Sequence, residues 1–364
     1  MRLSAGVLLL GLMVNAAVTD AADQWGLERG TPELSSATTL AFGPEDILFV
    51  GDAKAACVFA IATGNQEGDA ASAKINIEDV GQALRDALHA LQVTVNDLAV
   101  NPRTGAAFLA VTADQHAAIV QIDGAGKVSQ VSLESVRFAK AQLANAPADA
   151  VVGEGRRARN NRSDSITDIA FFENKVLVAG LSSKDAPSTV RELNFPFSKS
   201  DSGVSVEIYH AAHGRSEDYA AMRTFVPMMV DGEPSILGAY VCTPLVKIPI
   251  AELEKSGERV RAKTVAELGN RNQPLDMVTY TKGGQEFLLL SNSARGVMKI
   301  STAGLSSNAG LTEPVSGGGT AGQSYETIES FNGVVQLDKL NEQSALVLIQ
   351  SEGGVQSLKT VALP

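Results

Sequence analysis

Two histidines and two acidic residues lie close together in one short segment. His210 and His213 are separated by two alanines, and Glu217 and Asp218 follow a few residues later. Imidazole nitrogens and carboxylate oxygens are ligands that Zn²⁺ and Cu²⁺ accept in proteins. The neighbouring sequence supplies no clear further ligand, so a hydrogen-bonded connecting loop is the alternative. We predict His210 and His213, with Asp168 from elsewhere in the chain, as candidate metal ligands.

Three aspartates, Asp97, Asp168 and Asp276, open apolar strands of similar sequence, and a fourth such position holds Arg223. If these strands surround a common axis, the four side chains converge near one end of it. Carboxylate oxygens there suit Ca²⁺ or another divalent metal. The alternative is that each aspartate caps nearby backbone N–H groups while the arginine compensates their charge. We predict these four residues as a binding site at the mouth of a central tunnel.

The chain has two cysteines, Cys57 and Cys242, which is too few for a disulfide scaffold. They fall in different copies of the repeat described below. They are candidates for a disulfide with each other or, for Cys242 in a strand-connecting loop, for a reactive thiol. The alternative is that each is a small buried packing residue.

Charge and missing motifs exclude several classes of activity. A formal net charge of −11 argues against binding to nucleic acids or to anionic membrane surfaces. The chain has no G-x-S-x-G motif of a serine hydrolase and no C-x-x-C-H motif for covalent haem. Its glycine-rich segments do not open a helix after a strand, which a nucleotide-binding loop requires.

The elements that must position these residues recur along the chain. Each unit reads as a short apolar strand, a turn, a second apolar strand, a small or polar loop and a third strand. Equivalent positions are spaced by roughly 50–70 residues, the length of a propeller blade with insertions. They are Ala41, Ala99, Ala170, Phe225, Val278 and Val335. The sequence therefore predicts an all-β chain that forms a single six-bladed β-propeller, with seven blades or a pair of β-sandwiches as alternatives.

Two segments interrupt the repeat within the predicted propeller domain, residues 23–364. In residues 76–91, Val80, Leu84, Leu88 and Leu91 fall on one stripe, which predicts an inserted amphipathic helix. Residues 139–163 are predicted to be an inserted, arginine-rich loop. A strand near residues 24–27 or 33–37 is expected to close the ring by joining the last blade.

The first 22 residues are typical of a cleaved secretory signal peptide. Arg2 precedes an apolar run, and small residues follow it. The run is too short to span a membrane, and no later segment reaches that length without a charge. We therefore expect a periplasmic or secreted protein without a membrane span.

Two copies of the repeat resemble a known group of propellers. Leu40-Ala-Phe-Gly-Pro-Glu-Asp and Asp97-Leu-Ala-Val-Asn-Pro-Arg-Thr-Gly are similar to the blade consensus of NHL, YVTN and gluconolactonase-like propellers. The resemblance implies an exported propeller with a ligand-facing central depression. Gluconolactonase-like enzymes are metal-dependent lactonases, in which Asp97, Asp168 and Asp276 would correspond to metal ligands. This chain departs from their pattern because Thr39 stands where that group has a glutamate.

The function predicted from the sequence is that of a non-catalytic binding propeller, which presents loops on one face to a protein or small-molecule ligand. One alternative is a metal-dependent hydrolase or lactonase that uses the three aspartates, with Arg223 stabilising an oxyanion. Another is an accessory subunit of a periplasmic redox system, docked to a redox protein. No cofactor is fixed by the sequence; Ca²⁺ or another divalent metal is the candidate.

Overall fold

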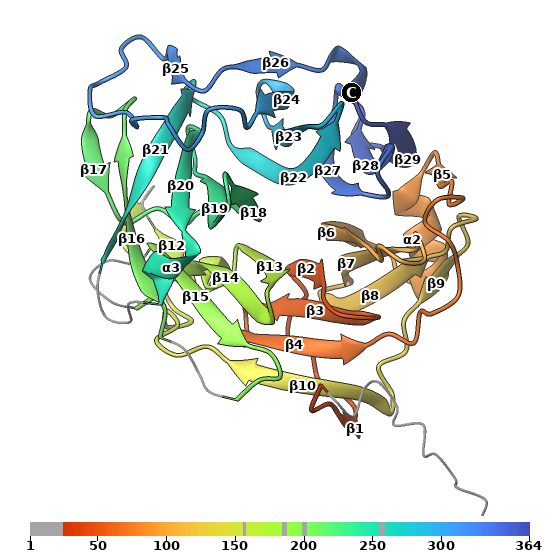
Figure 1. The fold of residues 1–364 in the computed structure, drawn as a ribbon. Helices are drawn as coiled ribbons and strands as arrows, with labels where there is room; N and C mark the ends of the chain where they lie inside the picture. Colours follow the sequence, from red (N-terminus) through yellow and green to blue (C-terminus); the bar gives the residue numbers. More distant parts are fainter. Residues whose placement is uncertain (1–24, 156–157, 184–187, 199–201, 255–258) are drawn as a thin grey trace, which may run out of the picture.

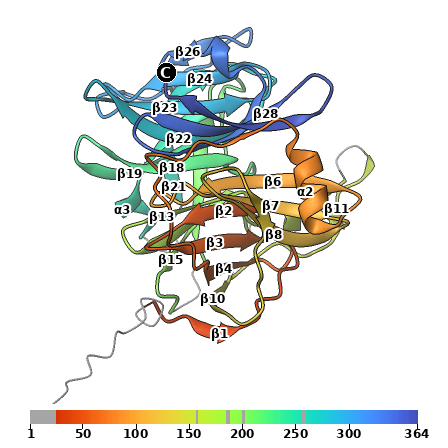
Figure 2. The same cartoon turned by 90° about the vertical axis from the view of Figure 1, so that its right-hand side faces the viewer.

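The structure, a computed structural model, describes residues 25–155, 158–183, 188–198, 202–254 and 259–364. In this part of the chain, β-strands surround a central axis in a propeller-like arrangement (Figure 1; Figure 2). The predicted all-β class and propeller arrangement are confirmed. The predicted signal peptide lies outside the described residues. No helix among the described residues is long and apolar enough to cross a membrane.

The strands form antiparallel sheets that are named here by their innermost strands. The β2 sheet has the order β1 (Glu28–Gly30), β10 (Val136–Gln142), β4 (Cys57–Ala62), β3 (Ile47–Asp52), β2 (Thr39–Phe42). The β6 sheet has β6 (Val93–Val100), β7 (Ala107–Ala113), β8 (His116–Ile122), β9 (Val128–Gln130). The β22 sheet has β22 (Pro274–Lys282), β23 (Gln285–Asn292), β24 (Gly296–Ser301), β26 (Tyr325–Thr327). The β27 sheet has β27 (Val334–Lys339), β28 (Ser344–Gln350), β29 (Gln356–Ala362), β5 (Asn76–Ile77).

The remaining large sheet is continuous over ten strands. One half is β13 (Asp168–Phe172), β14 (Lys175–Leu181), β15 (Ser188–Asn194), β16 (Val204–His210), with β17 (Arg215–Glu217) beside β16. The other half is β18 (Thr224–Val230), β19 (Glu233–Ala239), β20 (Pro244–Pro249), β21 (Val260–Leu268), with β25 (Thr320–Gly322) beside β21. The halves join where β16 and β21 pair in parallel. Because this junction makes one sheet of two, the number of blades is not fixed by the sheet count.

The order of the sheets around the axis differs from their order in the chain. The innermost strands contact one another in the sequence β2, β6, β27, β22, β18, β13 and back to β2 (Figure 1). The chain therefore builds most of the β2 sheet, continues into the β6 sheet on one side, and returns. It then adds β10 to the β2 sheet and proceeds to β13 on the other side.

This path explains how the ring is closed. The closing strand was expected near residues 24–27 or 33–37, and that expectation is wrong. β1 instead pairs with β10 in the β2 sheet, whereas β5 pairs with β29 in the β27 sheet. The β6 sheet lies beside the β27 sheet, so residues that precede β6 in the chain can reach the outer strand β29 of the β27 sheet.

The hydrophobic core is divided into clusters between neighbouring sheets. Phe59 and Phe108 lie in the cluster between the β2 and β6 sheets, and Leu109 and Leu348 in that between the β6 and β27 sheets. All four are at most 2% exposed. Burial of each such side chain stabilises the fold by roughly 1.5–3 kcal/mol, so packing between sheets holds the ring together.

The two predicted insertions contain regular elements. In residues 76–91 the structure has the helix α2 (Val80–Leu88), whose N-cap Asp79 accepts a hydrogen bond from the backbone N–H of Gln82 at 2.8 Å. The helix ends at His89, which has a left-handed backbone, and Leu91 lies beyond it and is 86% exposed. Residues 139–163 contain the end of β10, then β11 (Val151–Val152), β12 (Arg159–Asn160) and the 3₁₀-helix η2 (Asn161–Asp164). A short helix α3 (Ile250–Leu253) and a 3₁₀-helix η3 (Glu329–Phe331) complete the described elements.

Close backbone approach at Gly180 in β14 allows one test of this packing. A Cβ atom added there would lie 2.2 Å from the backbone oxygen of Ser165, which is fully buried. We expect Gly180→Ala to lower the free energy of unfolding by about 3 kcal/mol, because backbone cannot yield as a side chain can. Gly353→Ala, whose Cβ would come no closer than 3.9 Å to Ser351 Oγ, is the control. Equal denaturation midpoints for the two variants would contradict the close approach.

Candidate functional site

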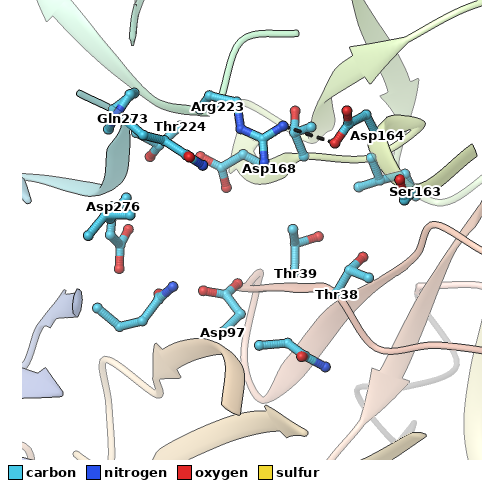
Figure 3. Close-up of a pocket in the computed structure, with 16 residues that line it drawn as sticks. Thr38, Thr39, Asp97, Ser163, Asp164, Asp168, Arg223, Thr224, Gln273 and Asp276 are labelled. Atoms are coloured by element: carbon cyan, nitrogen blue, oxygen red, sulfur yellow. Dashed lines mark hydrogen bonds and ion pairs between the residues drawn. The ribbon is translucent and has the colours of Figure 1, made fainter. Parts of the chain in front are cut away.

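A polar cavity opens at one mouth of the central channel. Its volume is about 270 Å³, and it is lined from the inner ends of several sheets and from η2 (Figure 3). All four residues of the predicted tunnel-mouth site contribute to its wall. They are Asp97 on β6, Asp168 on β13, Arg223 just before β18, and Asp276 on β22.

Each of the three aspartates binds the backbone of two strands. One carboxylate oxygen of Asp97 accepts from the N–H of Leu40 in β2 at 2.6 Å, and the other accepts from its own neighbour Leu98 at 2.9 Å. Asp168 accepts from the N–H of Phe225 in β18 at 2.8 Å and from that of its neighbour Ile169. Asp276 accepts from the N–H of Leu337 in β27, also at 2.8 Å, and from that of its neighbour Met277. The backbone-capping alternative considered for these residues describes their contacts, and each aspartate clamps two neighbouring inner strands together.

Two further residues of this ring were not among the residues predicted from the sequence. Asp338 on β27 accepts from the N–H of Val100 in β6 at 2.7 Å and clamps another pair of inner strands. With its amide nitrogen turned toward the carboxylates, Gln336 donates to Asp97 and to Asp276 at 2.9 Å each. The two polar residues that alternate in Gln336-Leu-Asp338 on an inner strand could have identified this pair. Alignment of the last repeat on Val335 instead places the position that matches the aspartates at Gly333.

Desolvation and mutual repulsion act on the channel carboxyls. Burial raises the pKa of Asp97 well above its usual range, and the charge of Asp168 adds to this. Burial raises the pKa of Asp168 to about 7 and that of Asp338 to about 6. The pKa of Asp276 is also raised well above its usual range, by burial and then by Asp97. Asp168 and Asp338 thus titrate near neutral pH rather than near pH 4.

Arg223 does not pair with the three aspartates. Its Nη1 lies 2.9 Å from a carboxylate oxygen of Asp164, at the rim of the cavity (Figure 3). The residue that matches Thr39 in the ring is Thr224, because Asp97 and Asp168 bind the N–H groups that directly follow these threonines. The repeat alignment that equated Arg223 with the aspartates was therefore one residue out of register.

The two predicted histidine ligands lie in a different part of the molecule. His210 ends β16 and His213 lies in the turn before β17. The Nδ1 atoms of both rings contact the carboxylate of Glu217, at 2.9 Å for His210 and 2.7 Å for His213. Arg215 Nε also donates to this carboxylate, at 2.9 Å. Burial works against the ionised carboxylate, but these hydrogen bonds lower the pKa of Glu217 to about 2.

The third ligand predicted for the histidines was wrong. Asp168 lies on the central channel, whereas the residue beside the histidines is Cys242, in the turn between β19 and β20. A ring nitrogen of His210, one of His213 and the sulfur of Cys242 all lie within 4.8 Å of one another. The sequence could not reveal this group, because Cys242 comes from the other half of the ten-stranded sheet.

Both cysteines are free thiols. Cys57 is fully buried in β4 of the β2 sheet, whereas Cys242 is partly exposed in the ten-stranded sheet. Their positions on different sheets account for the absence of the disulfide considered for them. Burial raises the pKa of the Cys57 thiol to about 12, so Cys57 is the small packing residue of the alternative interpretation.

The sequence matches no protein-family model and no curated protein sequence. Solved structures do match over most of the chain. A chain of the plexin A4 extracellular region matches at 10% identity and TM-score 0.44, over 93% of this chain and 40% of that one. The C-terminal WD40 domain of Sif2 matches at 10% identity and TM-score 0.35, over 93% and 98%. Aldose sugar dehydrogenase from Streptomyces coelicolor, in its PQQ-bound form, matches at 11% identity and TM-score 0.28, over 91% and 96%. None of these matches bears on the activity of this chain.

Proposed function

We propose that this chain is an exported, six-bladed propeller that binds a small cationic ligand at the mouth of its central channel and does not transform it. The count of six treats each half of the ten-stranded sheet as one blade. Six innermost strands that contact one another in a closed order support this count. Export rests on the signal-peptide pattern of residues 1–22.

The observation that carries the proposal is an excess of carboxyl groups in the channel wall. Among the described residues, Asp97, Asp168 and Asp276 form no ion pair, and the arginine of the cavity is held by Asp164. Carboxylates held near one another raise each other's pKa, and a cation between them relieves that repulsion. A divalent ion or an alkylammonium group supplies the same positive charge in a cavity of about 270 Å³.

The same contacts count against the hydrolase alternative. The carboxylate oxygens already accept backbone N–H groups, and Arg223 is held at the rim by Asp164. Arg223 is therefore not available as the oxyanion donor of that alternative, whereas the lone pairs that remain on the carboxylates can still contact a cation. The metal-dependent lactonase therefore stays a prediction from the resemblance, and binding without turnover is the function that we propose.

A charge series at one position tests this function without touching the strand clamps. Gln273 lines the cavity and is exposed, and its side chain can be replaced by Lys, Met or Glu. We expect the affinity for the cation to fall about tenfold in Gln273→Lys and to rise about tenfold in Gln273→Glu, relative to Gln273→Met. Isothermal titration at pH 8 with CaCl₂ and, separately, with 1,4-diaminobutane distinguishes a metal from an amine.

The outcomes are separable. A cation site is supported if the affinity for one probe decreases from Gln273→Glu through Gln273→Met to Gln273→Lys. The probe that does not bind then identifies the class of ligand, metal or amine, that the site rejects. No binding of either probe, or equal affinity in all three variants, contradicts the proposal. Release of a product from a lactone panel that disappears in Asp168→Asn would instead support the hydrolase.

A further inference from the structure

Three groups with metal-binding chemistry meet far from the central channel. His210 and His213 come from the β16–β17 hairpin, and Cys242 comes from the β19–β20 turn. Their candidate ligand atoms lie within 4.8 Å of one another, and the centres of the two imidazole rings are 3.8 Å apart. Two imidazoles with one thiolate is a donor set that favours copper or zinc over hard cations.

Glu217 fixes which nitrogen each histidine can offer. An ionised carboxylate only accepts hydrogen bonds, so the two Nδ1 atoms that contact it carry the protons. The lone pair of each neutral ring is then on Nε2. A carboxylate that holds the far nitrogen of a histidine in this way is the usual support of a metal-bound imidazole, since it sets the tautomer and the ring orientation.

His210 carries an unused polar atom in the protein interior. Its side chain is only 5% exposed, and its Nε2 has no hydrogen-bond partner. A buried polar atom without a partner is unfavourable, and a ligand at that atom would remove this cost.

The cysteine is held in its position by an unusual backbone. Cys242 and Thr243 have φ angles of 63° and 45°, a left-handed conformation that is costly for residues other than glycine. The Cys242 N–H donates to the backbone oxygen of Asn272 at 2.9 Å, and the Thr243 hydroxyl donates to the Asn272 side chain at 2.9 Å. The turn thus keeps the thiol beside the hairpin of the neighbouring half-sheet.

We propose that His210, His213 and Cys242 bind one copper or zinc ion, with Glu217 as the positioning residue for both imidazoles. Binding converts the thiol to a thiolate and releases one proton, while the imidazoles bind as neutral ligands. The His213 side chain is 43% exposed, so the ion is reached from solvent and keeps a position for a further small ligand. The site goes beyond the proposed cation binding in the channel and does not depend on it.

The test uses the full chain, freed of metal by dialysis against a chelator. We expect one equivalent of metal per chain in competition titrations with Cu⁺ and with Zn²⁺, the tighter of the two defining the natural class. A Co²⁺ or Cu²⁺ adduct should show a thiolate-to-metal charge-transfer band. Affinity should fall at least a hundredfold in Cys242→Ala and His213→Gln, and about 10–100-fold in Glu217→Gln.

Matched controls exist for both ligand types. Cys57→Ala removes the other cysteine and His116→Gln an exposed histidine of β8, and both should retain the charge-transfer band. Metal should also protect Cys242 of the unaltered chain, but not of His213→Gln, from alkylation mapped by mass spectrometry. This measurement needs no cysteine variant, so misfolding of Cys242→Ala cannot obscure it.

Loss of metal binding in the cysteine and histidine variants, with protection of Cys242, supports the site. Metal that binds equally in Cys242→Ala, or alkylation of Cys242 at the same rate with and without metal, overturns it. Cation binding in the Gln273 series is unaffected by either result, so the two proposals can fail separately.

Discussion

Asp97→Ala is expected to lower the free energy of unfolding by about 3 kcal/mol. The Asp97 carboxylate accepts from the N–H groups of Leu40 and Leu98, at 2.6 and 2.9 Å, and also lies 2.9 Å from the Gln336 amide nitrogen. Its removal leaves two partly buried backbone donors without their partner, and each such loss costs roughly 1–3 kcal/mol. The two losses add to about 2–6 kcal/mol, and water in the channel can replace part of the lost bonding, which places the estimate in the lower half of that range.

The control is Asp164→Ala at the rim of the same cavity. Asp164 pairs with Arg223, and both side chains are partly exposed, so its loss should cost no more than about 1 kcal/mol. Asp97→Asn keeps one acceptor oxygen and should fall between the two. Chemical denaturation monitored by circular dichroism gives the three values, and similar losses for Asp97→Ala and Asp164→Ala would refute the clamp.

The clamps show what the sequence could and could not predict. Asp97, Asp168 and Asp276 share a place at the start of apolar strands, and that local regularity was enough to predict that they meet. The repeat alignment on Val335 pointed to Gly333 as the matching position, whereas the structure places Gln336 there, and Asp338 lies two residues further along the strand. Alignment by apolar residues also placed Arg223 where Thr224 belongs, because residues 225–230 are apolar without alternation and therefore do not fix the register of that copy.

Long-range features were beyond the sequence for a different reason. The ring order and the closing strand β5 depend on which sheet the chain enters after β4, and no local pattern encodes that choice. The proximity of Cys242 to His210 and His213 likewise depends on the parallel junction of β16 and β21. Short spacing revealed the two histidines, whereas the thiol comes from another half-sheet.

The protein is expected to lose stability as the pH rises from 5 to 8. The folded pKa of Asp168 is raised to about 7 and that of Asp338 to about 6, above the values near 4 of an unfolded chain. The folded state therefore binds more protons in this range. The stabilisation is fully present below pH 4 and is lost as the pH rises through the folded pKa. For Asp168 the shift of about 3 pKa units corresponds to at most about 4 kcal/mol, less the screening by water in the channel.

Other groups titrate in the same range, so the comparison must be made with a variant. Burial raises the pKa of Glu267 to about 7, which acts in the same direction as Asp168. Burial lowers the pKa of His210, and this contribution instead grows as the pH rises. Asp168→Asn removes the titration of Asp168 and leaves that of Asp338, Glu267 and His210 in place. At pH 5 its unfolding free energy should be lower than that of the wild type, because asparagine keeps only one of the two acceptor oxygens. Between pH 5 and 8 its unfolding free energy should fall by about 2–3 kcal/mol less than that of the wild type.

The pH dependence also links stability to the proposed ligand. A cation binds the ionised carboxylates, so its affinity should increase as the pH rises through about 7, where Asp168 loses its proton. Saturating cation should then restore at pH 8 part of the stability that the unliganded protein loses there. Asp164→Asn, at the rim, should keep the wild-type slope. A wild-type stability that stays level or increases between pH 5 and 8, with a slope equal to that of Asp168→Asn, would mean that the channel carboxyls are already ionised. The repulsion from which we inferred a cationic ligand would then be too weak to support it.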